Sequence, residues 1–217
     1  MDGVTGPAQR LDDLPPHPGG LALTDRAMDL CGFGRGARLL DLGCGWGATL
    51  RHLTQKYGVS MGGIDIDAGL VEGRAGLICA SAEAIPLPDE SLDGVFMECS
   101  LSVMDDPDAV VRECRRVLRS GGRLALSDMY ARGEAAALRG CLGRLERSET
   151  QIARLERSGF RLELFEDHSE ELRRAWGQML FEKGAEASCS ELGTDIASLR
   201  AIRIGYFLAI ARKGASR

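Results

Sequence analysis

Three alternate glycines, Gly43, Gly45 and Gly47, separate an apolar run that contains Asp41 from a helical pattern that begins at Ala48. Glycine permits a tight turn and a close approach of the backbone to a ligand, and the free amides at a helix N-terminus suit an anionic group. Asp41 can accept a hydrogen bond from a cationic amine. This segment therefore predicts a cofactor-binding turn.

A second acid supports the same interpretation. Asp65 ends the next apolar run, 18 residues after Gly47, where an acid meets the adenosine ribose in doubly wound folds. Gly43, Gly45 and Ala48 also satisfy the dinucleotide pattern G-x-G-x-x-G/A, so a nicotinamide cofactor stays open at this point. A ligand-free structural turn is a third interpretation, which the acids at both strand ends disfavour.

Composition excludes several other classes of protein. The net charge is -5, which argues against a general nucleic-acid binder. No apolar run reaches the roughly 18 residues of a membrane span, and the first residues lack the basic start and apolar stretch of a secretory signal. The seven cysteines are scattered without a CxxC pair. We therefore expect no metal site, reduced thiols and a cytoplasmic location.

Short apolar runs alternate with helical patterns, which predicts a parallel sheet covered on both faces by helices. Thr24 is expected to cap the first helix, and Ser120-Gly121-Gly122 to end the helix that Asp106-Pro107 starts. We expect one domain over 1–217, with an arm at 1–20, a cofactor-binding core at 21–130 and an acceptor-side insertion with closing strands at 131–217. The predicted strands are 37–42, 59–66, 77–80, 92–97, 123–128, 161–165 and 203–212, and the predicted helices 23–30, 48–56, 107–119, 149–158 and 169–183.

Several ordered motifs resemble the class I S-adenosylmethionine-dependent methyltransferases, in particular small-molecule enzymes similar to those of ubiquinone and menaquinone biosynthesis. The segments that carry the resemblance are Leu40-Asp41-Leu42-Gly43-Cys44-Gly45-Trp46-Gly47, Gly63-Ile64-Asp65-Ile66, 80–93, 113–124 and 206–213. The resemblance implies a doubly wound, mostly parallel, seven-stranded Rossmann-like sheet with an antiparallel last strand. It also implies S-adenosylmethionine as cofactor and S-adenosylhomocysteine as product.

The family's cofactor residues map onto matching positions of this chain. They are Asp41, Gly43, Cys44, Gly45, Gly47, Asp65, Ile66, Ser81, Ala82 and Glu98. The family usually has an aspartate at the position of Ser81, where it contacts the adenine amino group. A serine hydroxyl can still form a hydrogen bond, and Glu83 is the candidate substitute for the missing charge.

A second departure from the family lies between the second and third strands. Only 11 residues separate Asp65 from Leu77, and Gly69, Gly73 and Gly76 are among them. Each glycine lowers helix stability by about 1 kcal/mol. We predict a stunted helix of about two turns around 68–75. The alternative is that some residues of the native chain are absent from this sequence.

The resemblance also points to the residues around the reacting methyl group. His17, Glu98, Cys99 and Tyr130 are the pocket candidates, whereas His52 is expected on the surface and His168 beside a helix cap. No general base is assigned, because methyl transfer needs one only when the acceptor must lose a proton.

The expected function is methyl transfer to a small-molecule acceptor whose identity the sequence leaves open, as it does the oligomeric state. Arg132, Arg139 and Arg144, in the segment after the fifth strand, are either attractants for an acidic substrate or a solvated helix face. The alternative function is a catalytically inactive protein that binds S-adenosylmethionine or S-adenosylhomocysteine and serves as a regulator or scaffold.

Overall fold

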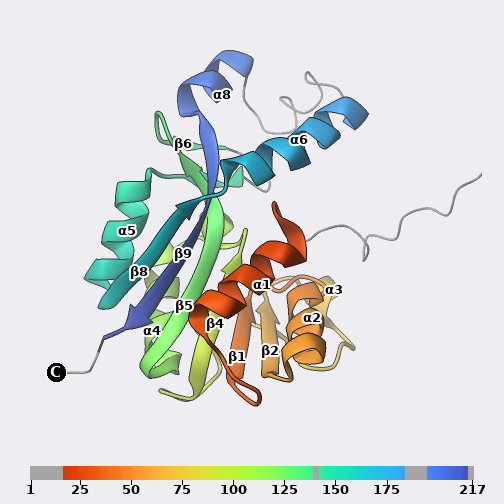
Figure 1. Ribbon diagram of the computed structural model, residues 1–217, viewed down its shortest axis with the longest axis vertical. Helices are drawn as coiled ribbons and strands as arrows, with labels where there is room; N and C mark the ends of the chain where they lie inside the picture. Colours follow the sequence, from red (N-terminus) through yellow and green to blue (C-terminus); the bar gives the residue numbers. More distant parts are fainter. Residues whose placement is uncertain (1–16, 139–141, 184–194, 215–217) are drawn as a thin grey trace, which may run out of the picture.

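A twisted sheet of seven strands, in the order β3-β2-β1-β4-β5-β9-β8, forms the centre of the computed structural model, which describes residues 17–138, 142–183 and 195–214 (Figure 1). The strands from β3 to β5 are parallel, and β9 runs antiparallel to both β5 and β8. The predicted sheet with an antiparallel last strand is confirmed. Its strands are β1 (Arg38–Leu42), β2 (Ser60–Asp65), β3 (Leu77–Cys79), β4 (Leu92–Glu98), β5 (Leu118–Ala131), β8 (Phe160–Asp167) and β9 (Ile204–Lys213).

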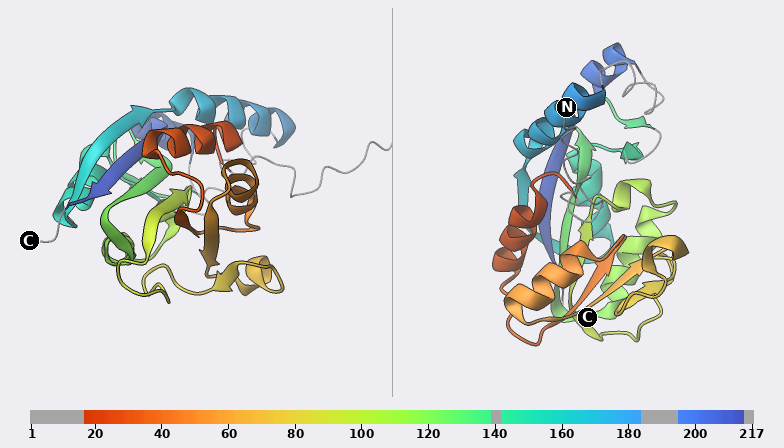
Figure 2. Two further views of the ribbon diagram at one scale, coloured as in Figure 1. Left: turned by 60° about the horizontal axis from the view of Figure 1, so that its bottom comes forward. Right: turned by 90° about the vertical axis from the view of Figure 1, so that its right-hand side faces the viewer.

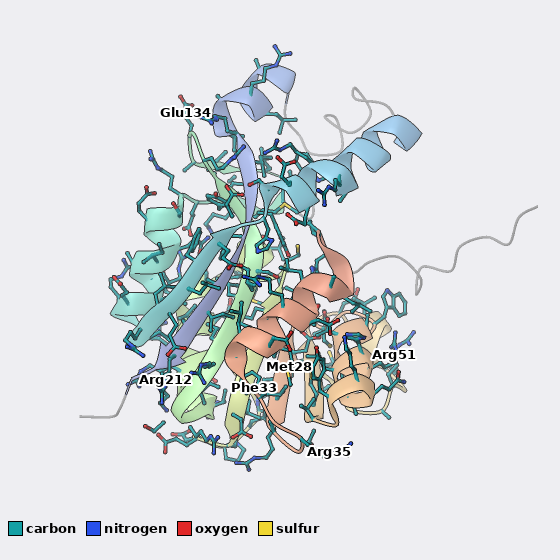
Figure 3. All side chains as sticks on the ribbon, viewed as in Figure 1. Met28, Phe33, Arg35, Arg51, Glu134 and Arg212 are labelled. Carbon is teal, nitrogen blue, oxygen red and sulfur yellow. The ribbon has the colours of Figure 1, made fainter. Side chains whose placement is uncertain are left out.

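Helices cover both faces of this sheet, because successive side chains of its central strands point to opposite sides. On one face, Leu39 and Phe96 pack with Met28 of α1 and Leu53 of α2. Figure 2 shows α1 and α6 on this side of the sheet. In Figure 3, Met28 and Phe33 lie near the C-terminal end of α1. The other face packs against α4 and α5. The helices are α1 (Gly20–Cys31), α2 (Ala48–Tyr57), α3 (Ala68–Val71), α4 (Pro107–Val117), α5 (Ser148–Arg157), α6 (Ser169–Lys183) and α8 (Ile196–Ile202), with a 3-10 turn, η2 (Leu101–Val103).

Two predicted helix ends are wrong. Helix α1 begins at Gly20, so Thr24 lies inside it, and the Thr24 hydroxyl donates to the Glu98 carboxylate instead of capping the helix. Helix α4 ends at Val117, and Ser120-Gly121-Gly122 belongs to β5. The sheet prevails there because Leu118 already pairs with Leu92 of β4, and the glycines fall in a register shift before Arg123 pairs with Gly94.

The segment after β2 contains the predicted stunted helix, although it is shorter than the two turns expected. Helix α3 is a single turn of 4 residues. The Asp67 carboxylate accepts the amide proton of Gly69 and starts the turn, and Gly73 adopts a left-handed φ of 72° just beyond its end.

The acceptor-side segment contains elements that the sequence did not predict. A short hairpin of β6 (Ala136–Ala137) and β7 (Arg144–Leu145) follows β5, and α8 precedes β9. Within the described residues, no helix combines the length and the apolar character that a membrane span requires.

The packing of β2 predicts a sharp difference between two adjacent glycines. A Cβ at position 63 would lie 2.6 Å from Leu77 Cδ2 and 2.8 Å from Cys44 Sγ, whereas one at position 62 would meet only ordinary contacts of 3.7 Å or more. Gly63→Ala should therefore lower the free energy of unfolding by about 1–3 kcal/mol through overpacking. Gly62→Ala is the matched control and should stay within about 0.5 kcal/mol of the parent in denaturant titrations. Equal stability of the two variants would contradict the close approach.

Candidate functional site

The turn after β1 lies where the connections of the sheet diverge. Strand β1 pairs with β2 on one side and with β4 on the other, so its carboxyl end is the topological switch point at which doubly wound folds bind ligands. The amides of Gly43 and Cys44 both donate to the Ile64 carbonyl, at 2.8 and 3.1 Å. These bonds fix the turn to the end of β2.

The three glycines of the turn all have positive φ, but their surroundings differ. A Cβ at Gly43 would lie 2.5 Å from Ser100 Cβ, and one at Gly47 would lie 3.2 Å from Leu77 Cδ1. A Cβ at Gly45 would meet nothing within 4 Å. The protein's own packing therefore fills the space beside Gly43 and crowds that beside Gly47, whereas Gly45 faces open space.

Asp65 connects this turn to the end of β2. One carboxylate oxygen accepts the amide proton of Gly45 at 2.9 Å, and the other accepts that of Asp67 at 3.0 Å. A carboxylate has about four acceptor positions, and these two bonds leave some of them free. Asp65 can therefore still accept hydrogen bonds from the hydroxyl groups of a ligand. The predicted ribose-binding acid thus lies against the predicted glycine turn.

A pocket of about 350 Å³ opens beside Asp65. It lies between the ends of β2 and β3 and the η2 turn, and its wall includes five of the ten predicted cofactor residues together with Cys99. Those five are Gly43, Asp65, Ile66, Ser81 and Ala82. The other five do not line it: Asp41 belongs to β1 and Glu98 to β4, while Cys44, Gly45 and Gly47 belong to the turn that leads into α2.

The residues at the expected adenine end are already engaged with each other. Ser81 Oγ accepts the amide proton of Glu83 at 3.1 Å. The Glu83 carboxylate accepts the amide proton of Asp106 at 2.8 Å, just before α4. Both side chains lie on the pocket wall, so the exchange of roles between Ser81 and Glu83 stays a prediction that this geometry permits.

The opposite wall depends on a buried aspartate. Asp128, at the end of β5, accepts the amide and hydroxyl protons of Ser102 at 2.8 and 2.9 Å. Burial raises the pKa of Asp128 to about 6, although these donors favour the carboxylate. Because Ser102 belongs to η2, Asp128 fixes the turn that places Val103 on the pocket wall.

Glu98 is the centre of a buried hydrogen-bond network at the end of β4. Its carboxylate accepts the hydroxyl protons of Thr24 at 2.8 Å and Thr49 at 2.5 Å, and it lies 3.2 Å from His17 Nε2. Burial alone would raise the pKa of Glu98, but the ion pair with His17 and the hydroxyl donors hold it below its ordinary value. Three chain segments thus converge on one carboxylate.

Asp41 lies next to this network and behaves differently. Burial raises the pKa of Asp41 well above its ordinary value, and the negative charge of Glu98 raises it further. Glu98 therefore carries the negative charge of the pair, and a cationic ligand at this end would favour the ionised form of Asp41 as well.

Cys99 follows Glu98 in a left-handed conformation, with a φ of 54°. Its thiol donates to the Tyr206 hydroxyl at 3.3 Å, which in turn donates to Ser127 Oγ at 3.0 Å. Burial raises the pKa of Tyr206 well above its ordinary value. Cys99 therefore reaches both the pocket wall and a buried chain of hydroxyls.

Tyr130 lies away from the described pocket. Its ring packs edge-on against Phe165 and Phe207, and its hydroxyl donates to Asp167 at 3.0 Å. Burial raises its pKa to about 12. These contacts place Tyr130 in the core between β5 and β8 and give it no place on the pocket wall.

The remaining candidates take part in structural contacts. His52 pairs with Asp25 at 2.7 Å and His168 with Glu166 at 3.1 Å. Arg132 and Arg144 donate to backbone carbonyls, and Arg139 lies outside the described residues. Over the described ranges, no group of three or more His, Cys, Asp or Glu side chains could hold a metal ion.

Three members of this site were not identified from the sequence: Thr24, Thr49 and Tyr206. Their positions along the chain carry no pattern that marks them, because each acts through a partner distant in sequence. The one available signal was the place of Thr49 in the first turn after the glycines.

Comparison with known proteins identifies the same region. The sequence profile of the Methyltransferase domain family matches residues 40–126. The 27-O-demethylrifamycin SV methyltransferase of Amycolatopsis mediterranei is 33% identical over 177 residues, which cover 71% of this chain and 65% of that protein. The ubiquinone/menaquinone biosynthesis C-methyltransferase UbiE of Hahella chejuensis is 35% identical over 111 residues, 45% of each chain. The chain thus spans about half to two thirds of the length of these curated relatives.

The fold has matching solved structures as well. A geranyl diphosphate methyltransferase in complex with S-adenosylmethionine superimposes with a TM-score of 0.74 over 89% of this chain and 85% of that chain, at 18% identity. At this identity the similarity shows the fold alone.

Gly45 provides a direct test of the pocket. Gly45→Arg should abolish the binding of S-adenosylmethionine, because the new side chain would extend into the open space that Gly45 faces. Gly36→Arg is the matched control: it also has a positive φ and no atom near its Cβ position, but it lies in the loop between α1 and β1. Calorimetric titration should show binding for the control only; full affinity in both variants would contradict a ligand at Gly45.

Proposed function

Because this chain belongs to the class I S-adenosylmethionine-dependent methyltransferases, with S-adenosylmethionine as its cofactor, we propose that it transfers the methyl group of that cofactor to a small organic acceptor. The observation that carries the proposal is the contact between Asp65 and the Gly45 amide, since it joins the ribose-binding acid and the glycine turn into one wall of a pocket. The printed names of the relatives, which include an O- and a C-methyltransferase of small molecules, support the acceptor class.

In this proposal, different residues of the site contact different parts of the cofactor. Asp65 accepts the ribose hydroxyls, and Ile66, Ser81 and Ala82 surround the adenine. The turn at Gly43–Gly47 faces the methionine part, which extends toward Asp41 and Glu98 at the ends of β1 and β4.

The cofactor supplies a methyl group on a positively charged sulfonium, and its transfer leaves the neutral thioether of S-adenosylhomocysteine. The protein's contribution is to hold the acceptor in line with the methyl–sulfur bond and to exclude water, because alignment can supply most of the acceleration of such a displacement. Cys99, which lies on the pocket wall, is the candidate neighbour of the acceptor.

The ribose role of Asp65 predicts a measurable loss of affinity. Hydrogen bonds to a charged group contribute about 1.5–3 kcal/mol each, so Asp65→Ala should raise the dissociation constant for S-adenosylmethionine by about 10- to 100-fold. Asp67→Ala is the matched control, because this nearby aspartate is exposed and caps α3 outside the pocket. An unchanged dissociation constant for Asp65→Ala would contradict its role.

Binding and turnover separate the proposed function from its alternatives. Calorimetry should show binding of S-adenosylmethionine and S-adenosylhomocysteine, and not of NAD or NADP. Transfer of a radiolabelled methyl group should then appear with a member of a panel of small hydroxyl, amine and carbon acceptors. Binding without turnover across that panel would favour the cofactor-binding regulator or scaffold.

A further inference from the structure

One wall of the pocket is an irregular stretch of chain. Residues 103–105 lead from η2 toward the start of α4, and all three line the pocket. The amides of Val103 and Met104 form long hydrogen bonds of 3.3 Å, to the carbonyls of Ser100 and Leu101. Both bonds lie within the same short turn, so they connect this stretch to its own neighbours in sequence. Its place beside the pocket therefore depends on contacts with other elements.

Two carboxylates fix the residues on either side of this stretch. Before it, the Asp128 carboxylate accepts the amide and hydroxyl protons of Ser102 at 2.8 and 2.9 Å. After it, the Glu83 carboxylate accepts the amide proton of Asp106 at 2.8 Å. The residues that line the pocket, 103–105, lie between these two anchors, and a third element contacts them there.

That third element is the hairpin of β6 and β7, in the acceptor-side segment. The half-buried Arg144 donates from Nη1 to the Met104 carbonyl at 3.3 Å and from Nη2 to the Asp105 carbonyl at 3.2 Å. The planar fork of a guanidinium suits two acceptors that are held side by side. Next to Arg144, the backbone of Gly143 comes so close that a Cβ there would overlap the Ser102 carbonyl. The hairpin thus packs directly against the pocket wall.

We propose that Arg144 is a positioning residue for the cofactor, which couples the β6–β7 hairpin to the pocket wall at 103–105. The inference rests on the proposed function, which places the adenosine part of S-adenosylmethionine in this pocket. While Arg144 holds both carbonyls, the wall is in place before the ligand arrives, so binding requires little ordering of the chain. Without these bonds the ligand must order the wall itself, and its affinity falls. Because coupling between two sites is reciprocal, cofactor binding also stabilises the hairpin.

Calorimetric titration of variants tests the positioning role. Arg144→Ala should raise the dissociation constants for S-adenosylmethionine and S-adenosylhomocysteine by about 5- to 50-fold. The factor should be the same for both ligands, because they share the adenosine part. A lysine ammonium is a point charge without the fork of a guanidinium, so Arg144→Lys should raise both constants by a smaller factor. This conservative variant carries the test if the alanine variant does not fold.

Arg132→Ala is the matched control. Arg132 belongs to the same acceptor-side segment and also donates to a backbone carbonyl, that of Arg203, but neither residue lines the described pocket. The control should therefore keep both dissociation constants within about twofold of the parent. Unchanged affinity in Arg144→Ala, or an equal loss in Arg132→Ala, would overturn the proposal.

Hydrogen exchange provides a readout that a purely structural role of Arg144 would not change. The Leu138 amide donates to the Gly143 carbonyl at 2.8 Å inside the hairpin and lies outside the pocket wall. At saturating S-adenosylhomocysteine its exchange should slow by up to the same factor, about 5- to 50-fold, in the parent and in Arg132→Ala. Arg144→Ala should lose this slowing, and equal slowing in that variant would contradict the coupling. Failure of the parent protein to bind either ligand would instead contradict the proposed function.

Discussion

The reversal of the chain between β1 and α2 is the constraint on which the site depends. Gly43 has no room for a side chain, because Ser100 occupies the space where its Cβ would lie, and a Cβ at Gly47 would crowd Leu77. The two amides that bind the Ile64 carbonyl hold the turn against β2. This packing leaves Gly45 as the residue of the turn that faces open space, with Asp65 fixed beside it. The pocket is thus a consequence of how closely the turn approaches its neighbours.

A second constraint is the cost of burying carboxylates at the ends of β1 and β4. Glu98 remains ionised because α1, α2 and the turn at His17 each supply a donor, whereas burial favours the neutral form of Asp41. Burying an unpaired charge costs free energy. Glu98 therefore needs the hydroxyls of Thr24 and Thr49 and the imidazole of His17 as partners at this position. The same contacts join α1 to the sheet next to the site.

The remaining walls depend on short irregular segments rather than on long helices. The single turn of α3 and the η2 turn flank the pocket, and each is fixed by an aspartate that accepts backbone amides, Asp67 and Asp128. Since such turns contribute little burial of their own, the Asp128 carboxylate holds the η2 side of the pocket wall, whereas Asp67 holds only the α3 turn outside the lining residues. The longer elements of the sheet supply the rigid base.

The sequence by itself determined the order of the seven sheet strands and the main helices between them, the glycine turn, the acid at the end of β2 and the weakness of the helix at 68–75. These features depend on local chemistry: apolar runs favour strands, glycine permits left-handed turns, and three glycines destabilise a helix. The family resemblance added the antiparallel last strand.

Tertiary structure decided what local patterns could not. The local pattern predicted Thr24 as a helix cap, but its hydroxyl donates to Glu98, 74 positions away in the sequence. Ser120-Gly121-Gly122 appeared to be a helix stop until pairing with β4 drew it into β5. Tyr130 proved to be a core residue and His17 a buried ion-pair partner. For Thr24 a buried carboxylate, and for Ser120-Gly121-Gly122 a neighbouring strand, is the distant partner that overrides the local pattern, and only the folded chain brings such partners together.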